Sequence, residues 1–118
     1  MRTVRQGEIY WAEFDEPIGS EPGYLRPCVV VQNDLFNQSK LRTTVICTLT
    51  TNLKRATAPG NVLLNAGEAN LSELSVVNIT QLFTIDKQDL VDKIGQLSPE
   101  RMAQIIAGIK LLVEPATV

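Results

Sequence analysis

The pattern of hydrophobic and polar positions predicts a mainly β protein whose strands come first and whose single helix comes last. Six runs are rich in β-branched, aromatic or other apolar residues, and turn-forming residues separate most of them. One run, Cys28–Val31, is apolar at every position, which is typical of a strand buried on both faces. We therefore predict a coiled, barrel-like antiparallel sheet with strands at residues 8–14, 26–32, 43–51, 61–65, 74–79 and 81–85.

The C-terminal segment has a different period, because its apolar residues recur at helical spacing. Ser98 is a candidate N-cap, Pro99 would occupy the first helical position, and Pro115 marks the end. We expect the apolar stripe to pack on the sheet rather than to bind a partner. Gly108 should cost about 1 kcal/mol relative to Ala unless close packing requires it. The stripe consists of Met102, Ile105, Ile106, Ile109, Leu112 and Val113.

Length and composition narrow the class of protein. The 118 residues are 44% hydrophobic and 20% charged, which fits one globular domain spanning residues 1–118. Apolar runs are shorter than the roughly 18 residues that a membrane span needs, and no hydrophobic signal core follows the first residues. We therefore expect a cytoplasmic protein with no membrane partner.

The missing residue type is histidine, whose absence removes the usual general acid and base of neutral-pH chemistry. Cys28 and Cys47 lie in strand-like runs and are expected to be buried, and a cytosolic location disfavours a disulfide between them. Without histidine they cannot form a Cys/His zinc site, so we expect neither a metal nor a cofactor. An enzyme of this composition would work with carboxylates, hydroxyls and arginine. The net charge of −2 means that nucleic acid could bind only at a local patch.

Strand pairing brings candidate chemical groups to one edge of the predicted sheet. If residues 26–32 and 43–51 pair in antiparallel fashion, Arg26 lies beside Thr50. The adjoining loops would add a carboxylate, an aromatic ring and two cations, which together suit phosphate and base binding. Taken singly, each residue also has an ordinary structural explanation: a salt-bridged surface arginine, strand-forming threonines, a solvated loop acid and a packed loop tyrosine. The loop groups are Glu21, Tyr24, Lys54 and Arg55.

Five blocks, in this order, resemble the MazF/PemK/Kid family of toxin endoribonucleases over roughly residues 5–113. The first block, residues 6–21, ends in Gly19-Ser20-Glu21, and the second opens on Arg26-Pro27 before an apolar strand. The remaining blocks lie at residues 45–52, 81–87 and 94–100. Two positions depart from the family pattern: Leu74 stands where an acid is common, and Phe83 stands where an arginine is common.

The resemblance implies an SH3-like twisted β-barrel of the CcdB/PemK kind with a C-terminal helix. It also implies the toxin of a type II toxin–antitoxin system, acting as a homodimer that cuts single-stranded RNA sequence-specifically and without a metal. A MazE-like antitoxin with an acidic, disordered tail would neutralise it. Two other classes stay open: a non-catalytic CcdB-like toxin that binds gyrase or another protein, and a degenerate RNA-binding module. The retained Arg26 and Thr50 argue against both.

By the same resemblance, Arg26 and Thr50 are the catalytic pair and Glu21 helps to form the site. We assign Arg26 to clamping the phosphate in the transition state, Thr50 to donating a hydrogen bond to a phosphoryl oxygen, and Glu21 to the base role. We also expect Arg26 and Thr50 to be surface positions whose loss spares folding. RNA binding is assigned to Gly19, Ser20, Tyr24, Thr48, Thr51, Asn52, Lys54, Arg55 and Gln81.

Overall fold

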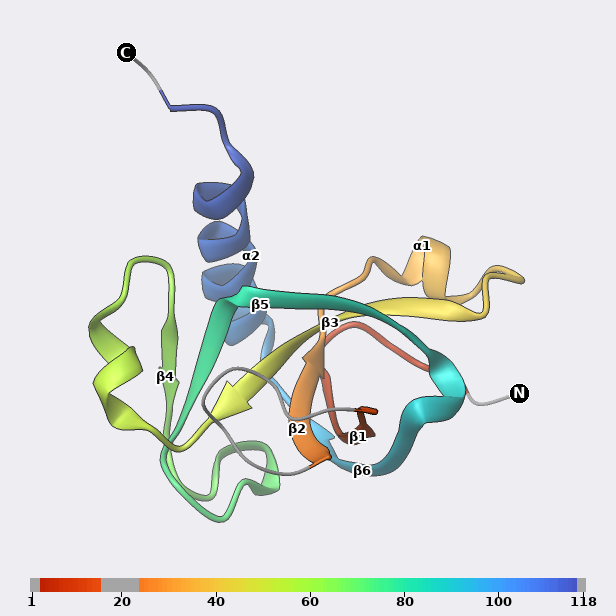
Figure 1. Ribbon diagram of the computed structural model, residues 1–118, viewed down its shortest axis with the longest axis horizontal. Coiled ribbons are helices and arrows are strands. Elements are labelled where there is room, and N and C mark those ends of the chain that lie inside the picture. Colours follow the sequence, from red (N-terminus) through yellow and green to blue (C-terminus); the bar gives the residue numbers. More distant parts are fainter. Residues whose placement is uncertain (1–2, 16–23, 117–118) are drawn as a thin grey trace.

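A computed structural model describes residues 3–15 and 24–116, and within them six strands form one antiparallel sheet (Figure 1). The spatial order is β4-β5-β3-β2-β1-β6, so the sheet curls into a half-barrel with β4 and β6 at its two edges. This confirms the predicted mainly β fold. The strands are β1 (Glu8–Glu13), β2 (Leu25–Val30), β3 (Thr43–Thr50), β4 (Val62–Leu64), β5 (Ser75–Asp86) and β6 (Leu90–Gln96).

The helices are short except for the last. The α-helices are α1 (Asp34–Asn37) and α2 (Pro99–Val113), and three 3-10 turns are η1 (Leu53–Thr57), η2 (Glu68–Asn70) and η3 (Lys87–Asp89). Helix α2 begins as predicted, because the Ser98 hydroxyl accepts a hydrogen bond from the Arg101 N–H at 3.2 Å and Pro99 follows it.

The central strands bury apolar side chains on both faces, because successive residues of a strand point to opposite sides. One face, packed against α2, carries the larger core, which includes Val29, Cys47, Leu49 and Ile105. The opposite face carries a smaller cluster, which includes Tyr10, Cys28, Val30 and Ile46. Cys28 and Cys47 therefore lie on different faces as buried free thiols, as expected from their apolar surroundings.

The structure corrects three expectations about the elements. The runs at 74–79 and 81–85 form one strand, β5, which shifts register against β3 between Cys47 and Leu49 instead of ending there. Strand β6 was not predicted, and neither was α1, which Asn33 caps by accepting a hydrogen bond from the Leu35 N–H.

The apolar stripe of α2 packs on the sheet only over its first part. Met102 and Ile105 are buried, whereas Leu112 and Val113 are 41% and 67% exposed. Gly108 is needed for close packing, because a Cβ there would collide with the backbone oxygen of Gly60. The expectation that the whole stripe packs on the sheet is therefore wrong for the last turn of α2.

The segment that follows β4 crosses to the other edge of the sheet and closes the half-barrel. The Asn70 side-chain amide donates to the Ile94 carbonyl oxygen on β6 at 3.1 Å, and a Cβ at Gly95 would collide with the Ala69 backbone oxygen. Glu68 in η2 also forms a 2.7 Å ion pair with Arg101 on α2. These contacts fix the segment that carries one wall of a pocket described below.

Candidate functional site

The strand register brings Arg26 and Thr50 together, as the sequence predicts. Strand β2 pairs with β3 through Cys28 and Thr48, so continuing the register by two residues places Arg26 opposite Thr50. Ala12 on β1 pairs with Arg26, and Val76 on β5 pairs with Thr50. Ala12, Arg26, Thr50 and Val76 therefore lie side by side across β1, β2, β3 and β5. The two polar residues of this row, Arg26 and Thr50, are neighbours.

Both residues are buried, which corrects the expectation that they are surface positions. Arg26 is 8% exposed and Thr50 is 5% exposed. The Arg26 Nη2 donates to the Leu49 carbonyl oxygen at 2.8 Å, and the Thr50 hydroxyl accepts from the Asn52 N–H at 3.1 Å. These bonds hold the guanidinium against β3 and shape the turn after it, so replacing either residue will affect folding.

Thr48 and Gln81 extend the same polar region toward the middle of the sheet. The Thr48 hydroxyl donates to the Gln81 Oε1 at 2.7 Å, joining β3 to β5. Cys28 lies opposite Thr48, and burial raises the pKa of its thiol to about 12. The thiol is therefore protonated at neutral pH. The polar groups nearest to it in the candidate site are the Arg26 guanidinium, the threonine hydroxyls and the Gln81 amide.

The predicted loop after β3 is a 3-10 turn that presents cations next to the site. Asn52 caps η1 by accepting the Lys54 N–H at 3.2 Å, and the Asn61 side chain donates to the Arg55 carbonyl oxygen at 2.9 Å. Lys54 and Arg55 are exposed, as is Thr51, which follows the end of β3.

The loop before β2 is described only at its ends. Tyr24 is exposed, and its carbonyl oxygen accepts the Phe14 N–H at 2.8 Å, which joins the two ends of the loop. Gly19, Ser20 and Glu21 lie outside the described residues.

Comparison with known proteins identifies the family. Residues 5–113 match the model of the PemK-like, MazF-like toxin of type II toxin–antitoxin systems. The chain belongs to this family. It is 37% identical over 112 residues to Endoribonuclease MazF6 of Mycobacterium tuberculosis, covering 95% of this chain and 98% of that protein. It is 33% identical over 108 residues to Endoribonuclease EndoA of Bacillus subtilis, covering 92% of each.

Solved structures of MazF-like proteins share the fold. An endoribonuclease from a mycobacterial species has a TM-score of 0.77 at 23% identity, covering 99% of this chain and 98% of that one. MazF from Deinococcus radiodurans has a TM-score of 0.76 at 20% identity, covering 98% and 100%. The predicted sheet and C-terminal helix are confirmed as the MazF fold.

One departure from the MazF-like pattern lies on the face of the candidate site. Phe83 pairs with Ile46 on β3, so its side chain shares a face with Thr48 and Gln81. Its ring packs edge-to-face on Phe14, with centroids 5.5 Å apart. An apolar pair thus stands where the resemblance led us to expect an arginine, and it packs against the smaller core. Leu74, the other departure, is exposed.

Among residues 3–15 and 24–116, no helix is long and apolar enough to cross a membrane. Among the same residues, no three His, Cys, Asp or Glu side chains are placed to hold a metal ion.

Proposed function

We propose that this chain is the endoribonuclease toxin of a type II toxin–antitoxin system and that Arg26 and Thr50 carry its chemistry. The observation that carries the proposal is the buried Arg26 facing Thr50 at the end of the sheet, in a chain whose full-length relatives are named endoribonucleases. The alternative of a CcdB-like toxin that binds a protein has no comparable support. Free, buried cysteines accord with action in the cytoplasm.

RNA supplies its own nucleophile, since the 2′-hydroxyl can attack the adjacent phosphorus and expel the 5′-oxygen of the next nucleotide. The products are a 2′,3′-cyclic phosphate and a 5′-hydroxyl. The protein must then stabilise charge on the pentavalent phosphorane and move protons. Arg26 suits the first task, because a guanidinium forks onto phosphate oxygens, and Thr50 adds a hydrogen bond. Glu21 stays the candidate base, because the pKa of an arginine exceeds about 12.

Cleavage of a long single-stranded RNA in EDTA tests this function. We expect cleavage to persist, to leave cyclic phosphate ends and to stop when the nucleotide before the cut carries a 2′-O-methyl group. Double-stranded RNA of the same sequence is the control and should resist, because its bases cannot splay. Loss of activity in EDTA with recovery in magnesium would contradict this mechanism.

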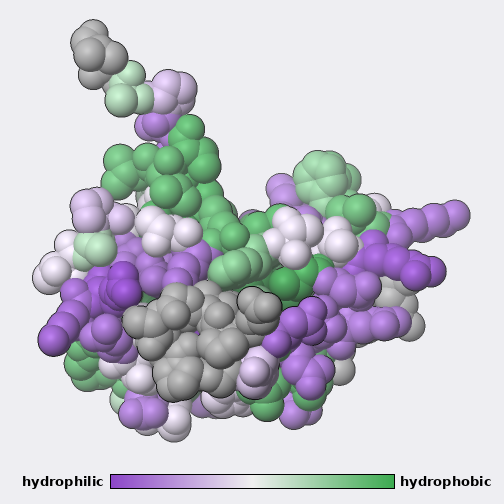
Figure 2. Space-filling model, in the orientation of Figure 1, coloured by the Kyte–Doolittle hydropathy of each residue, from purple (hydrophilic) through white to green (hydrophobic). Residues whose placement is uncertain are grey.

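The homodimer is part of the proposal, and the last turn of α2 supports it. Leu111, Leu112 and Val113 form an exposed apolar surface, which Figure 2 shows as the hydrophobic region over α2. A second copy would cover it. Light scattering at micromolar concentration should give a dimer for the parent chain and a monomer for Leu112→Arg. Leu63→Arg, at an equally exposed site on β4, is the matched control. A monomeric parent would contradict the dimer.

The acidic tail of the antitoxin should bind the cations of η1. We expect Lys54→Glu with Arg55→Glu to weaken inhibition by an acidic antitoxin peptide, and added salt to weaken it in the parent, because exposed charges are screened over about 10 Å at 0.1 M. Lys110→Glu on α2 is the control. Salt-independent inhibition would contradict this electrostatic account.

A further inference from the structure

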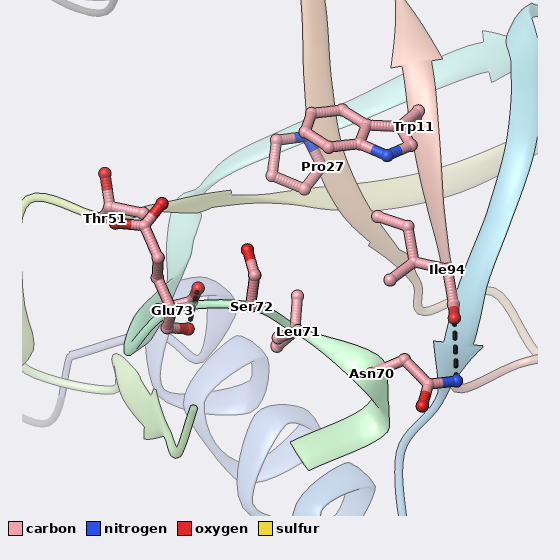
Figure 3. A pocket seen from close by; sticks show the side chains of 9 residues that line it. Trp11, Pro27, Thr51, Asn70, Leu71, Ser72, Glu73 and Ile94 are labelled. Atoms are coloured by element: carbon pink, nitrogen blue, oxygen red, sulfur yellow. Dashed lines mark hydrogen bonds between the residues drawn. The ribbon is translucent and has the colours of Figure 1, made fainter. Parts of the chain in front are cut away.

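A pocket of about 240 Å³ lies on the face of the sheet opposite the Arg26 and Thr50 side chains. Its floor and one wall come from β1, β2 and β6, and its other wall comes from the segment between η2 and β5 (Figure 3). Ligand pockets for drug-sized molecules usually exceed about 300 Å³, so this one suits a single flat ring system.

The pocket is directly adjacent to the candidate cleavage site. Trp11 and Pro27 pair with each other one step before the row that contains Arg26, and Thr51 follows Thr50 in the chain. Consecutive Cα atoms are about 3.8 Å apart, and their side chains alternate between faces. A strand of RNA with a phosphate at Arg26 therefore needs only to cross the end of the sheet for a neighbouring base to reach the pocket.

The walls of the pocket differ in chemistry. Trp11, 42% exposed, lies beside Pro27, and Leu71 and Ile94 complete an apolar surface (Figure 3). Thr51, Ser72 and Glu73 add two hydroxyls and a carboxylate along one side. A nucleobase has this same division, since its faces are apolar and stack on aromatic rings whereas its edge carries hydrogen-bonding groups.

We propose that this pocket binds one base of the RNA substrate, next to the cleaved phosphate, and selects bases that carry an exocyclic amino group. The inference rests on the proposed ribonuclease function. Stacking on Trp11 holds the base, and the Glu73 carboxylate, which is an acceptor only, pairs with the amino hydrogens of adenine, cytosine or guanine. Uracil has carbonyls where the amino groups of the other bases stand and offers Glu73 only its N3–H, so it should bind more weakly.

Charge favours a base over an apolar peptide side chain as the occupant. An apolar side chain would remove water from Glu73, Ser72 and Thr51 without replacing their hydrogen bonds, which is costly. An acidic side chain inside the pocket would be repelled by Glu73, whereas a nucleobase is neutral. A base can stack on the apolar wall and form hydrogen bonds with the polar wall at the same time.

The single tryptophan of the chain, Trp11, makes the test direct, because its fluorescence reports on this pocket. The probes are short 2′-O-methyl oligoribonucleotides of a single base, which cannot be cleaved by 2′-hydroxyl attack. We expect saturable quenching, with at least one amino-bearing base binding about 10-fold more tightly than oligo(U). Glu73→Gln should narrow that difference and change the base preference beside the cut in sequenced cleavage products. Glu114→Gln, which removes an exposed carboxylate at the far end of α2, should change neither.

The outcomes separate this inference from the proposed function. If the parent chain cuts RNA, but no oligonucleotide quenches Trp11 and Glu73→Gln leaves the cleavage preference unchanged, the pocket is not a base site. Quenching by an antitoxin peptide alone would identify a peptide site and would also overturn the inference. If the parent chain cuts no RNA, the proposed function fails, and quenching by the oligonucleotides still decides whether the pocket binds a base.

Discussion

The two faces of the sheet bury side chains of different polarity to a similar extent. Toward α2, the strands bury aliphatic side chains such as Leu49, whereas the opposite face buries Thr48 and Thr50, its neighbours in the same strand. Burying a polar group costs free energy unless it is hydrogen-bonded, and the structure shows bonds for Arg26, Thr48 and Thr50. The α2 face therefore holds the larger apolar core, whereas the opposite face combines a smaller apolar core with the buried polar side chains of the candidate site.

The largest expected effect on stability lies on the α2 face. Ile105→Ala removes a fully buried side chain from the larger core and should lower the free energy of unfolding by about 2–5 kcal/mol. Denaturant titration measures this, with exposed Lys110→Ala as the control, expected within about 0.5 kcal/mol of the parent. Cleavage per folded molecule should stay unchanged. A large loss of cleavage per folded molecule would contradict the claim that this face contributes to stability and not to cleavage.

A smaller effect is expected from two carboxylates, and it depends on pH. Burial alone would raise the pKa of Glu8, but hydrogen bonds from Lys93, the Arg5 N–H and the Tyr10 hydroxyl hold it below its ordinary value of 4.5. A hydrogen bond from Arg101 lowers the pKa of Glu68. Each carboxylate therefore stabilises the fold above pH 4.5, and this contribution is lost as the pH falls through the lowered pKa.

Comparing the two carboxylates sharpens the contrast between buried and exposed charge. Glu8→Gln should cost about 1.5–3 kcal/mol at pH 7, because the carboxylate is buried and accepts hydrogen bonds from three groups. Glu68→Gln should cost about 1 kcal/mol or less, because its ion pair is partly solvated. Unfolding measured at pH 7 and pH 3 should show a smaller difference for Glu8→Gln than for the parent. A larger cost for Glu68→Gln than for Glu8→Gln would contradict this ranking.

An effect on stability as small as that of Glu68→Gln is expected at Thr48, in the polar region of the candidate site. Thr48→Val keeps the shape of the side chain but removes its hydrogen bond to Gln81, which should cost about 0.5–1.5 kcal/mol. If the bond positions Gln81 for RNA, kcat/KM should fall up to about 10-fold, since each 1.36 kcal/mol is tenfold. Thr48→Ser restores the hydroxyl and should recover activity. Equal activity of the Val and Ser variants would show that the bond is only structural.

Local signals in the sequence explain which parts of the fold could be predicted. Strand β3 and helix α2 are marked by β-branched residues and by Ser98-Pro99, and both begin where predicted. Strand β6 has no such signal, because it is an edge strand with Val91, Asp92 and Lys93 all exposed and with Gly95 near its end. Its position follows from pairing with β1, a distant contact that periodicity cannot reveal.

The sequence could predict which residues of the candidate site lie side by side, but not that they are buried. Antiparallel pairing alone places Arg26 beside Thr50, whereas their burial depends on the neighbouring strands and loops. The pocket left no sequence signal, because Trp11 and Glu73 line the same pocket only when the segment after β4 crosses to β6. An aromatic residue within a strand is ordinarily read as core, and here it is half-open to solvent.

Single-turnover cleavage of RNA by Arg26→Ala, measured per folded molecule, tests the central claim most directly. Arg26→Lys keeps the positive charge but lacks the paired N–H donors of the guanidinium, and it serves as the folded comparison if the Ala variant is unstable. The account predicts that the Ala variant loses about 2.7–4 kcal/mol of transition-state stabilisation, a 100- to 1000-fold slower cut, while RNA binding falls less. The Lys variant should fall between the Ala variant and the parent. A folded Ala or Lys variant that cuts at the parental rate would contradict the assignment of Arg26 to the chemistry.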